Sequence, residues 1–128
     1  MGATVAAIAA HLPKGMTPID KTCFSSAAEP AFRQALEADG RGQVVLAGIE
    51  SHVCILQTAL GLAEQGREVF VADDATGARR AAHHRNAMER LRRDGIVVTN
   101  TESVIFEWLR DARHAQFKAV SALLKRQG

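Results

Sequence analysis

Short apolar runs alternate with longer amphipathic stretches through most of this chain. The runs at 44–47, 68–72 and 96–99 have the length and the β-branched content of strands. Between them, residues 55–65 and 81–93 carry apolar side chains at helical spacing. This alternation of strands and helices favours a parallel sheet flanked by helices, which is the α/β class of fold.

The flanking segments add helices but only one weak strand. We expect that strand at 17–21, with loops at 23–28 and 73–77. Further helices, bounded by proline and glycine, are predicted at 4–12, 30–38, 102–109 and 113–125. No repeat, low-complexity tract or linker divides the chain, so residues 1–128 form a single domain in this prediction.

The composition is that of an ordinary globular chain. Hydrophobic residues make up 47% and charged residues 23%, and the formal net charge of +2 gives no bulk attraction to nucleic acid or to membranes. No apolar run approaches the roughly 20 residues that span a bilayer. Two cysteines are too few for a disulfide scaffold, and nothing resembles a secretory signal. We therefore expect a cytoplasmic protein with free thiols and no membrane partner.

The main candidate for chemistry is Cys54, which closes the heptapeptide that begins at Gly48, after the 44–47 strand. It falls on the first turn of the next helix, where unpaired N–H groups and the helix dipole favour thiolate over thiol. Parallel sheets also place their ligand sites at the carboxyl ends of strands. Two interpretations stay open here: a nucleophile, or the small buried hydrophobe that most free cysteines are. Ser51 fits as the N-cap of this helix.

Other polar residues near strand ends are weaker candidates. Lys21 ends the weak strand; its ammonium would favour a neighbouring thiolate, although an isolated lysine is usually a solvated surface charge. His52 and Cys54 point in different directions on one helical turn, which argues against a Cys–His pair. Asp73 and Asp74 end a strand, where each either faces the crevice beside the thiol or serves a turn.

The helix at 81–93 is strongly basic. Six arginines lie on it and on its lead-in, namely Arg79, Arg80, Arg85, Arg90, Arg92 and Arg93. Acidic residues alternate with them and no aromatic residue interleaves for base stacking, so a solvated face is favoured over an RNA site. We expect one of His83 and His84 to be exposed and the other half-buried. No spacing matches a metal site, and we expect neither a metal nor a cofactor.

Two motif blocks in order give the chain a specific resemblance. They are Lys21-Thr22-Cys23-Phe24-Ser25 and GIESHVCILQTALGLAEQG, continued by 69–75 and 87–106. On these residues the chain resembles the isochorismatase-like hydrolases, also called the cysteine hydrolase family, and within them the isochorismatase-domain proteins. The resemblance runs from about Gly2 to Leu124. It implies a three-layer Rossmann-like fold with a central parallel sheet, here lacking its first strands.

The same resemblance implies a site and a reaction. Many relatives hydrolyse amides or related C–N bonds of small substrates through an Asp–Lys–Cys triad. Cys54 would be the nucleophile that forms a thioester, and Lys21 the triad lysine. A cis peptide bond between Ile49 and Glu50 is also implied, with the backbone N–H groups of Glu50 and Cys54 as an oxyanion hole. No metal is expected, since only His11 precedes the lysine as a possible ligand.

One triad member has no counterpart in this chain. The family's aspartate ends its first strand, and Met1-Gly2 aligns with an internal point of the relatives. Asp20 does not replace it, because neighbouring residues of an extended segment point to opposite sides. We therefore expect an amidase-type hydrolase with impaired turnover. The alternative is a non-catalytic interaction or oligomerisation domain that keeps the fold and binds partners through the exposed edge beside the 44–47 strand or through its basic helix. In either case we expect a homo-oligomer.

Overall fold

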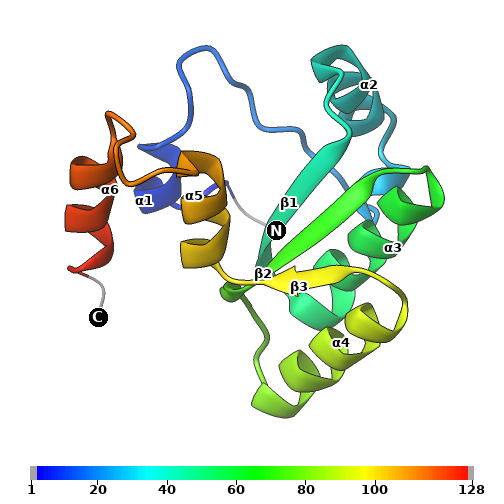
Figure 1. Ribbon diagram of the computed structural model, residues 1–128. Helices are drawn as coiled ribbons and strands as arrows, with labels where there is room; N and C mark the ends of the chain where they lie inside the picture. The colour runs from blue at the N-terminus through cyan, green and yellow to red at the C-terminus, as the bar shows by residue number, and fades with distance from the viewer. Residues whose placement is uncertain (1–2, 127–128) are drawn as a thin grey trace.

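The computed structural model describes residues 3–126 and builds them around three parallel strands (Figure 1). β1 (Gln43–Ile49) pairs with β2 (Glu68–Gly77), and β2 pairs with β3 (Val97–Thr99), so the strands lie in the order of the chain. The described part of the chain forms no fourth strand. The α/β fold with a parallel sheet is thereby confirmed, and the sheet is the partial one that the sequence predicts.

Helices connect and flank the strands. They are α1 (Ala6–Ala9), α2 (Pro30–Asp39), α3 (Leu56–Glu64), α4 (Ala81–Arg93), α5 (Thr101–Leu109) and α6 (Phe117–Leu124). Two short helical turns, η1 (Ser26–Ala28) and η2 (Ser51–Ile55), lead into α2 and α3. α4 has the predicted bounds. Gly40 ends α2 with φ of +67°, a left-handed conformation in which glycine carries no side-chain penalty.

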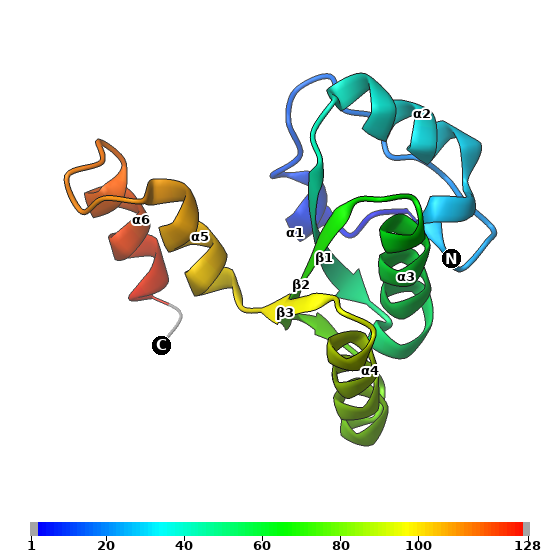
Figure 2. The same ribbon diagram turned by 45° about the vertical axis from the view of Figure 1, so that its right-hand side comes forward.

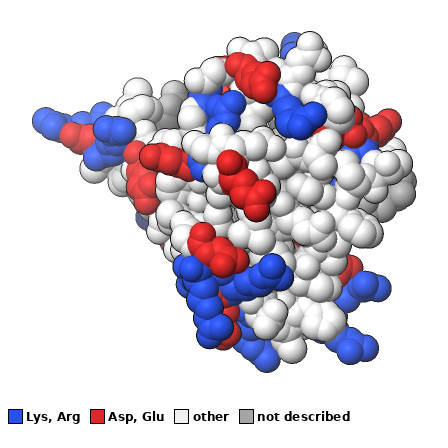
Figure 3. Space-filling view, turned by 90° about the vertical axis from the view of Figure 1, so that its right-hand side faces the viewer, with Lys and Arg blue, Asp and Glu red and all other residues white. Residues whose placement is uncertain are grey.

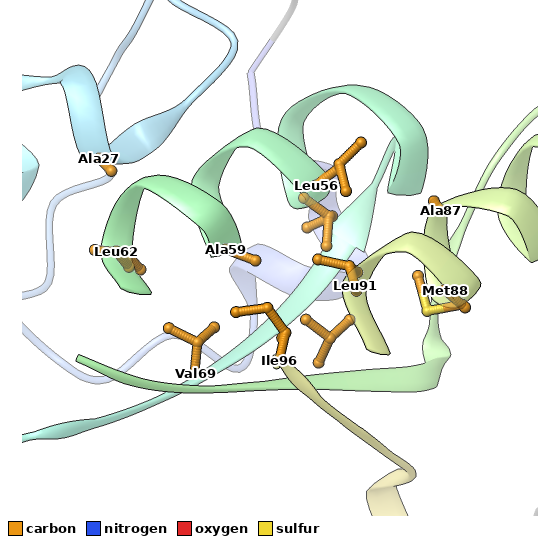
Figure 4. Close-up of a cluster of buried hydrophobic side chains, with 11 residues drawn as sticks. Ala27, Leu56, Ala59, Leu62, Val69, Ala87, Met88, Leu91 and Ile96 are labelled. Atoms are coloured by element: carbon orange, nitrogen blue, oxygen red, sulfur yellow. The ribbon is translucent and has the colours of Figure 1, made fainter. Parts of the chain in front are cut away.

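The hydrophobic core lies between the sheet and the layer formed by α3 and α4 (Figures 1 and 2). Its buried side chains are Ala27, Ile55, Leu56, Ala59, Leu62, Val69, Val71, Ala87, Met88, Leu91 and Ile96. Figure 4 shows Leu62 and Leu91 projecting from the two helices toward the strands. Val44 and Leu46 of β1 pack against this cluster from the sheet. Alternate residues of β1 therefore face the core, as strand geometry requires.

The opposite face of the sheet is largely open. Val45 and Ile49 of β1 are 39% and 75% exposed, and Val97 of β3 is 48% exposed. α5 is the helix that approaches this face, where Trp108 and Phe70 line a common groove with the start of β1. The three-layer arrangement is therefore incomplete in the described residues, and β1 forms an edge of the sheet.

Two strand predictions are wrong. Residues 17–21 form no strand, because Pro18 interrupts the segment and no neighbouring strand pairs with it. The predicted loop at 73–77 instead belongs to β2, which pairs with the end of β1 through Gly48 with Thr76 and Ile49 with Gly77. A register shift between Leu46 and Gly48 accommodates the extra length. Asp and Gly are poor strand formers, but pairing with a neighbour overrides that preference here.

Two terminal helices are shorter than predicted. α1 spans four residues and buries none of them, so little packing supports the helix expected over 4–12. α6 begins at Phe117 instead of residue 113, because Asp111 accepts hydrogen bonds from the backbone and the guanidinium of Arg113 and holds a turn there. Figures 1 and 2 both show α5 and α6 extending away from the main layers.

Candidate functional site

The candidate site lies where β1 passes into η2 and α3. Gly48, with φ of +117°, lies near the end of β1, and the peptide bond between the next two residues, Ile49 and Glu50, is cis. η2 is a π-helical turn that continues directly into α3, so residues 51–64 form one helical segment. Cys54 lies in this first turn and is half-buried. The thiol is therefore at the carboxyl end of a parallel strand and near the amino end of the following helix.

Ser51 does not act as the predicted N-cap. The first turn has no side-chain cap, and Glu50 is the capping position. Ser51 is fully buried, and its hydroxyl lies 2.8 Å from Nδ1 of His84 on α4. Nε2 of His84 lies 2.6 Å from the Asp73 carboxylate on β2. A side chain on a neighbouring helix thus provides a partner that the local sequence pattern does not reveal.

The Glu50 side chain faces a second group of polar residues. Its Oε1 pairs with Nε of Arg79 at 2.6 Å. Its Oε2 lies 3.6 Å from Nδ1 of His52, too far for a hydrogen bond, and both atoms are buried without a hydrogen-bond partner. The rings of His52 and His83 lie 4.6 Å apart. The Glu50 carboxylate is therefore engaged by Arg79, not by the thiol.

Lys21 lies in a loop that docks on α3. The Ser25 hydroxyl donates to the carbonyl of Gln57 at 3.1 Å, and the Ser26 N–H donates to the Thr58 hydroxyl at 2.9 Å. The Lys21 ammonium donates to the carbonyls of Cys23 and Phe24, at 2.8 and 3.0 Å. Among residues 3–126, no hydrogen bond joins this ammonium to Cys54. The fold brings the lysine loop to the helix of the thiol without pairing the two groups.

The two aspartates at the end of β2 have different partners. Asp73 contacts His84 and also lies 3.7 Å from the guanidinium of Arg92. Asp74 accepts from the hydroxyl and the N–H of Thr101, at 2.6 and 2.8 Å, and so ties β2 to the start of α5. The hydroxyl of Thr101 is the main reason that the pKa of the Asp74 carboxyl lies below its ordinary value of 3.8. Asp74 therefore has a structural role, whereas Asp73 is connected to the turn of Cys54 through His84 and Ser51.

The two histidines of α4 divide as predicted. His83 is exposed and His84 is half-buried. His84 lies on the inward stripe that continues through Met88 and Leu91, which was the one available sign that it has buried contacts. Sequence reasoning missed its two partners, because they lie 33 and 11 residues away and no motif links them.

Several arginines of this region are paired with carboxylates. Arg79 binds Glu50, Arg92 lies near Asp73, and Arg90 lies 3.8 Å from Asp94. Figure 3 shows Lys and Arg gathered at the lower end of that view, at the level of α4, with acidic atoms between them. The surface around α4 thus carries side chains of both charges.

Some features are absent from the described residues. Between residues 3 and 126, no group of three or more His, Cys, Asp or Glu side chains is arranged to hold a metal ion. Within the same range, no helix is long and apolar enough to cross a membrane. Both cysteines are free thiols.

These elements define an α/β domain with its candidate site at the carboxyl end of a parallel strand. Residues 1–103 match the family model of the isochorismatase domain. The chain therefore belongs to the isochorismatase domain family, as its motifs predict, and it has the isochorismatase-like hydrolase fold.

Known relatives are longer than this chain. Isochorismatase domain-containing protein 2A of Mus musculus is 40% identical, over 98% of this chain and 59% of its own length. The solved structure of a Caenorhabditis elegans protein called MAR1 ribonuclease superposes with a TM-score of 0.88 at 32% identity, covering 96% of this chain and 62% of that one. The chain thus spans about three fifths of the length of the relatives it matches.

One solved structure with the same fold is an oligomer. The Escherichia coli YcaC protein, described as an octameric hydrolase of unknown specificity, has a TM-score of 0.82. The match covers 99% of this chain and 69% of the YcaC chain. At 23% identity it shows a shared fold alone.

Proposed function

We propose that this chain carries the nucleophile of a cysteine hydrolase site that acts on a small C–N substrate such as an amide. The observation that supports this most directly is the place of Cys54, half-buried on the helical turn that follows β1. Backbone N–H groups at the start of a helix and the helix dipole favour a thiolate there. The resemblance to the cysteine hydrolases, which implies Cys54 as the nucleophile, supports the same assignment.

The reaction would proceed in two steps. The Cys54 thiol gives up its proton to water and the thiolate attacks the amide carbonyl. A C–S bond forms, the C–N bond breaks, and the amine leaves with the proton that water returns. Water then hydrolyses the thioester and releases the acid and the thiol. The N–H groups of Glu50 and Cys54 would stabilise the oxyanion, and Lys21 would stabilise the thiolate and the charged intermediates. Glu50 contributes its backbone in this scheme, which agrees with the engagement of its carboxylate by Arg79.

Turnover also needs a general base. The resemblance assigns that role to an aspartate with no counterpart in this chain, so we expect acylation of Cys54 to outpace hydrolysis of the thioester. The activity of the longer relatives is a proposal for this chain, not a property taken over from them. No cofactor enters the scheme, and a cytoplasmic setting would keep Cys54 reduced.

A panel of small amides tests the proposal. Release of amine by the wild-type chain is compared with release by Cys54→Ala, with Cys23→Ala as the matched control for the second thiol. We expect Cys54→Ala to lose the release and Cys23→Ala to retain it. Mass spectrometry of the quenched reaction should find the acyl group on the peptide that contains Cys54. Equal rates for wild type and Cys54→Ala would remove the thiol from the mechanism.

A second candidate function is that of an oligomerisation domain. It is favoured by the open face of the sheet, where Val45, Ile49 and Val97 are exposed, and by the unpaired edge of β1. Light scattering across a range of concentrations tests it. Oligomers together with a Cys54 that resists iodoacetamide at neutral pH would favour this function over hydrolysis.

An RNA substrate is a separate arm of the same test, because the Caenorhabditis elegans relative is called a ribonuclease. Two arginines of α4, Arg90 and Arg92, and Arg79 before it lie against carboxylates, so this region offers less free positive charge than its sequence indicates. We expect no binding of single-stranded RNA at low salt, where phosphate contacts are strongest. RNA binding that is present at low salt and weakens as salt is added would revive the RNA hypothesis.

A further inference from the structure

Asp73, His84 and Ser51 form a continuous chain of hydrogen bonds from β2 through α4 to the turn that carries Cys54. Asp73 Oδ1 lies 2.6 Å from His84 Nε2, and His84 Nδ1 lies 2.8 Å from the Ser51 hydroxyl. Ser51 is fully buried and His84 is half-buried. The scheme proposed above for hydrolysis uses none of these three side chains.

The direction of the hydrogen bonds follows from the chemistry of the groups. An ionised carboxylate only accepts, so Nε2 of His84 donates to Asp73. In the neutral imidazole the other nitrogen is then an acceptor, and the Ser51 hydroxyl donates to Nδ1. Asp73 thus selects the tautomer of His84, and His84 fixes the rotamer of Ser51.

The connectivity matches that of a Ser–His–Asp hydrolase triad, but burial excludes this function. A nucleophilic hydroxyl has to reach a substrate, and Ser51 has no exposed surface. The same burial makes the hydroxyl a strong anchor, because breaking a buried hydrogen bond leaves a polar group unsatisfied.

Ser51 anchors the segment that matters for Cys54. It begins η2, three residues before the thiol, and it follows Glu50 directly. The carbonyl of Glu50 accepts from the N–H groups of Val53 and Ile55, at 3.1 and 3.3 Å. The turn is therefore held by its own backbone and, through Ser51, by His84 on the neighbouring helix.

We propose that His84, oriented by Asp73, is a positioning residue that holds Ser51 and with it the helical turn on which Cys54 lies. This inference rests on the proposed role of Cys54 as the nucleophile. It assigns His84 no contact with substrate. Its effect is to fix the backbone of the turn that carries Cys54, so that the thiol is held in one position before any substrate binds.

The rate of alkylation by iodoacetamide tests the inference without any turnover, because only the thiolate reacts. Asp73→Asn is nearly isosteric, and its amide can donate to Nε2, which moves the imidazole proton to Nδ1 and reverses the bond to Ser51. Ser51→Ala removes the hydroxyl altogether. At pH 7 we expect both variants to lower the rate at Cys54 about threefold.

Two controls separate positioning from general loosening of the fold. Asp74→Asn makes the same change at the next residue, which binds Thr101 and not His84, and should leave the rate at Cys54 unchanged. Cys23, followed in the same sample by peptide mass, should keep its rate in every variant. The inference is overturned if the rate at Cys54 is unchanged in both Asp73→Asn and Ser51→Ala, or if the two cysteines change together.

The two experiments together distinguish failure of the positioning role from failure of the proposed function. Loss of amide hydrolysis only in Cys54→Ala, with unaltered alkylation in Asp73→Asn and Ser51→Ala, supports the nucleophile and overturns the positioning role. The reverse pattern, slower alkylation without any hydrolysis, supports the positioning role and overturns the proposed activity.

Discussion

Replacing Leu62 by Ala tests whether the layer of α3 and α4 forms a well-packed core in a chain of this length. Leu62 is fully buried on α3, the helix that begins at the Cys54 turn, and it belongs to the cluster shown in Figure 4. The substitution removes three carbon atoms from a site without solvent contact. It therefore measures how tightly the helix of the thiol is held against the sheet.

The magnitude follows from burial. Three methylene-sized groups returned to water account for roughly 2.4 kcal/mol at about 0.8 kcal/mol each. A partly collapsed cavity raises the expected loss of unfolding free energy to about 3 kcal/mol, within the range typical of buried leucines. For a domain of this size that loss lowers the melting temperature by about 10 °C.

Urea unfolding followed by far-UV circular dichroism measures the change. Leu123→Ala on α6 is the matched control, because that side chain is 59% exposed and its truncation should cost less than about 0.5 kcal/mol. A loss below 1 kcal/mol for Leu62→Ala, or equal losses in the two variants, would refute the claim of a packed core. The same would hold if the wild-type chain showed no cooperative transition.

Three further outcomes are expected. Asp74→Asn should cost no more than about 0.5 kcal/mol at pH 6, because this carboxylate is exposed and solvent screens its contacts. Thr101 lowers the pKa of that carboxyl in the folded state, so the wild-type contribution is complete above the unfolded pKa and is lost as pH falls through the folded pKa. Urea titrations at pH 3 should therefore show a smaller difference. Val45→Lys on the open face should reduce any concentration-dependent association seen by light scattering, without changing the melting temperature by more than a few degrees. Gly48→Ala should lose about 1–3 kcal/mol in urea unfolding because φ is +117°, whereas Gly42→Ala, with open space around it, should be nearly neutral.

The sequence was sufficient for the elements whose signals are local. The periodicity of 81–93 predicts α4 to the residue, and the three strongest apolar runs are the three strands. It failed where pairing with distant residues decides the structure. The end of β2 is a strand only because the end of β1 lies beside it, and residues 17–21 are not a strand because nothing lies beside them. Local β-propensity predicts neither the strand at the end of β2 nor the absence of a strand at residues 17–21.

The candidate site likewise combines features that the local sequence predicts with features that depend on distant residues. The position of Cys54 after β1 follows from local pattern, and the family motifs add Lys21 and Glu50 as expectations. The role of Ser51 was predicted wrongly, because the best local use of a serine before a helix is a cap, and a buried partner on another helix displaced it. Ser51 can meet His84 only once β1, β2 and α4 are packed together.

The Cys54 turn is held by contacts that do not include the general base. The contacts that shape the Cys54 turn, from Glu50, Ser51, His84 and Asp73, all lie within the described residues. The general base that the family resemblance implies, by contrast, is not among these contacts, and the Lys21 ammonium is hydrogen-bonded within its own loop. Preorganisation of a nucleophile and completion of a catalytic cycle are therefore separable here. We therefore expect the folded chain to show a selectively reactive Cys54 even where it turns over no amide, and we expect that reactivity to depend on Asp73 more than on Lys21.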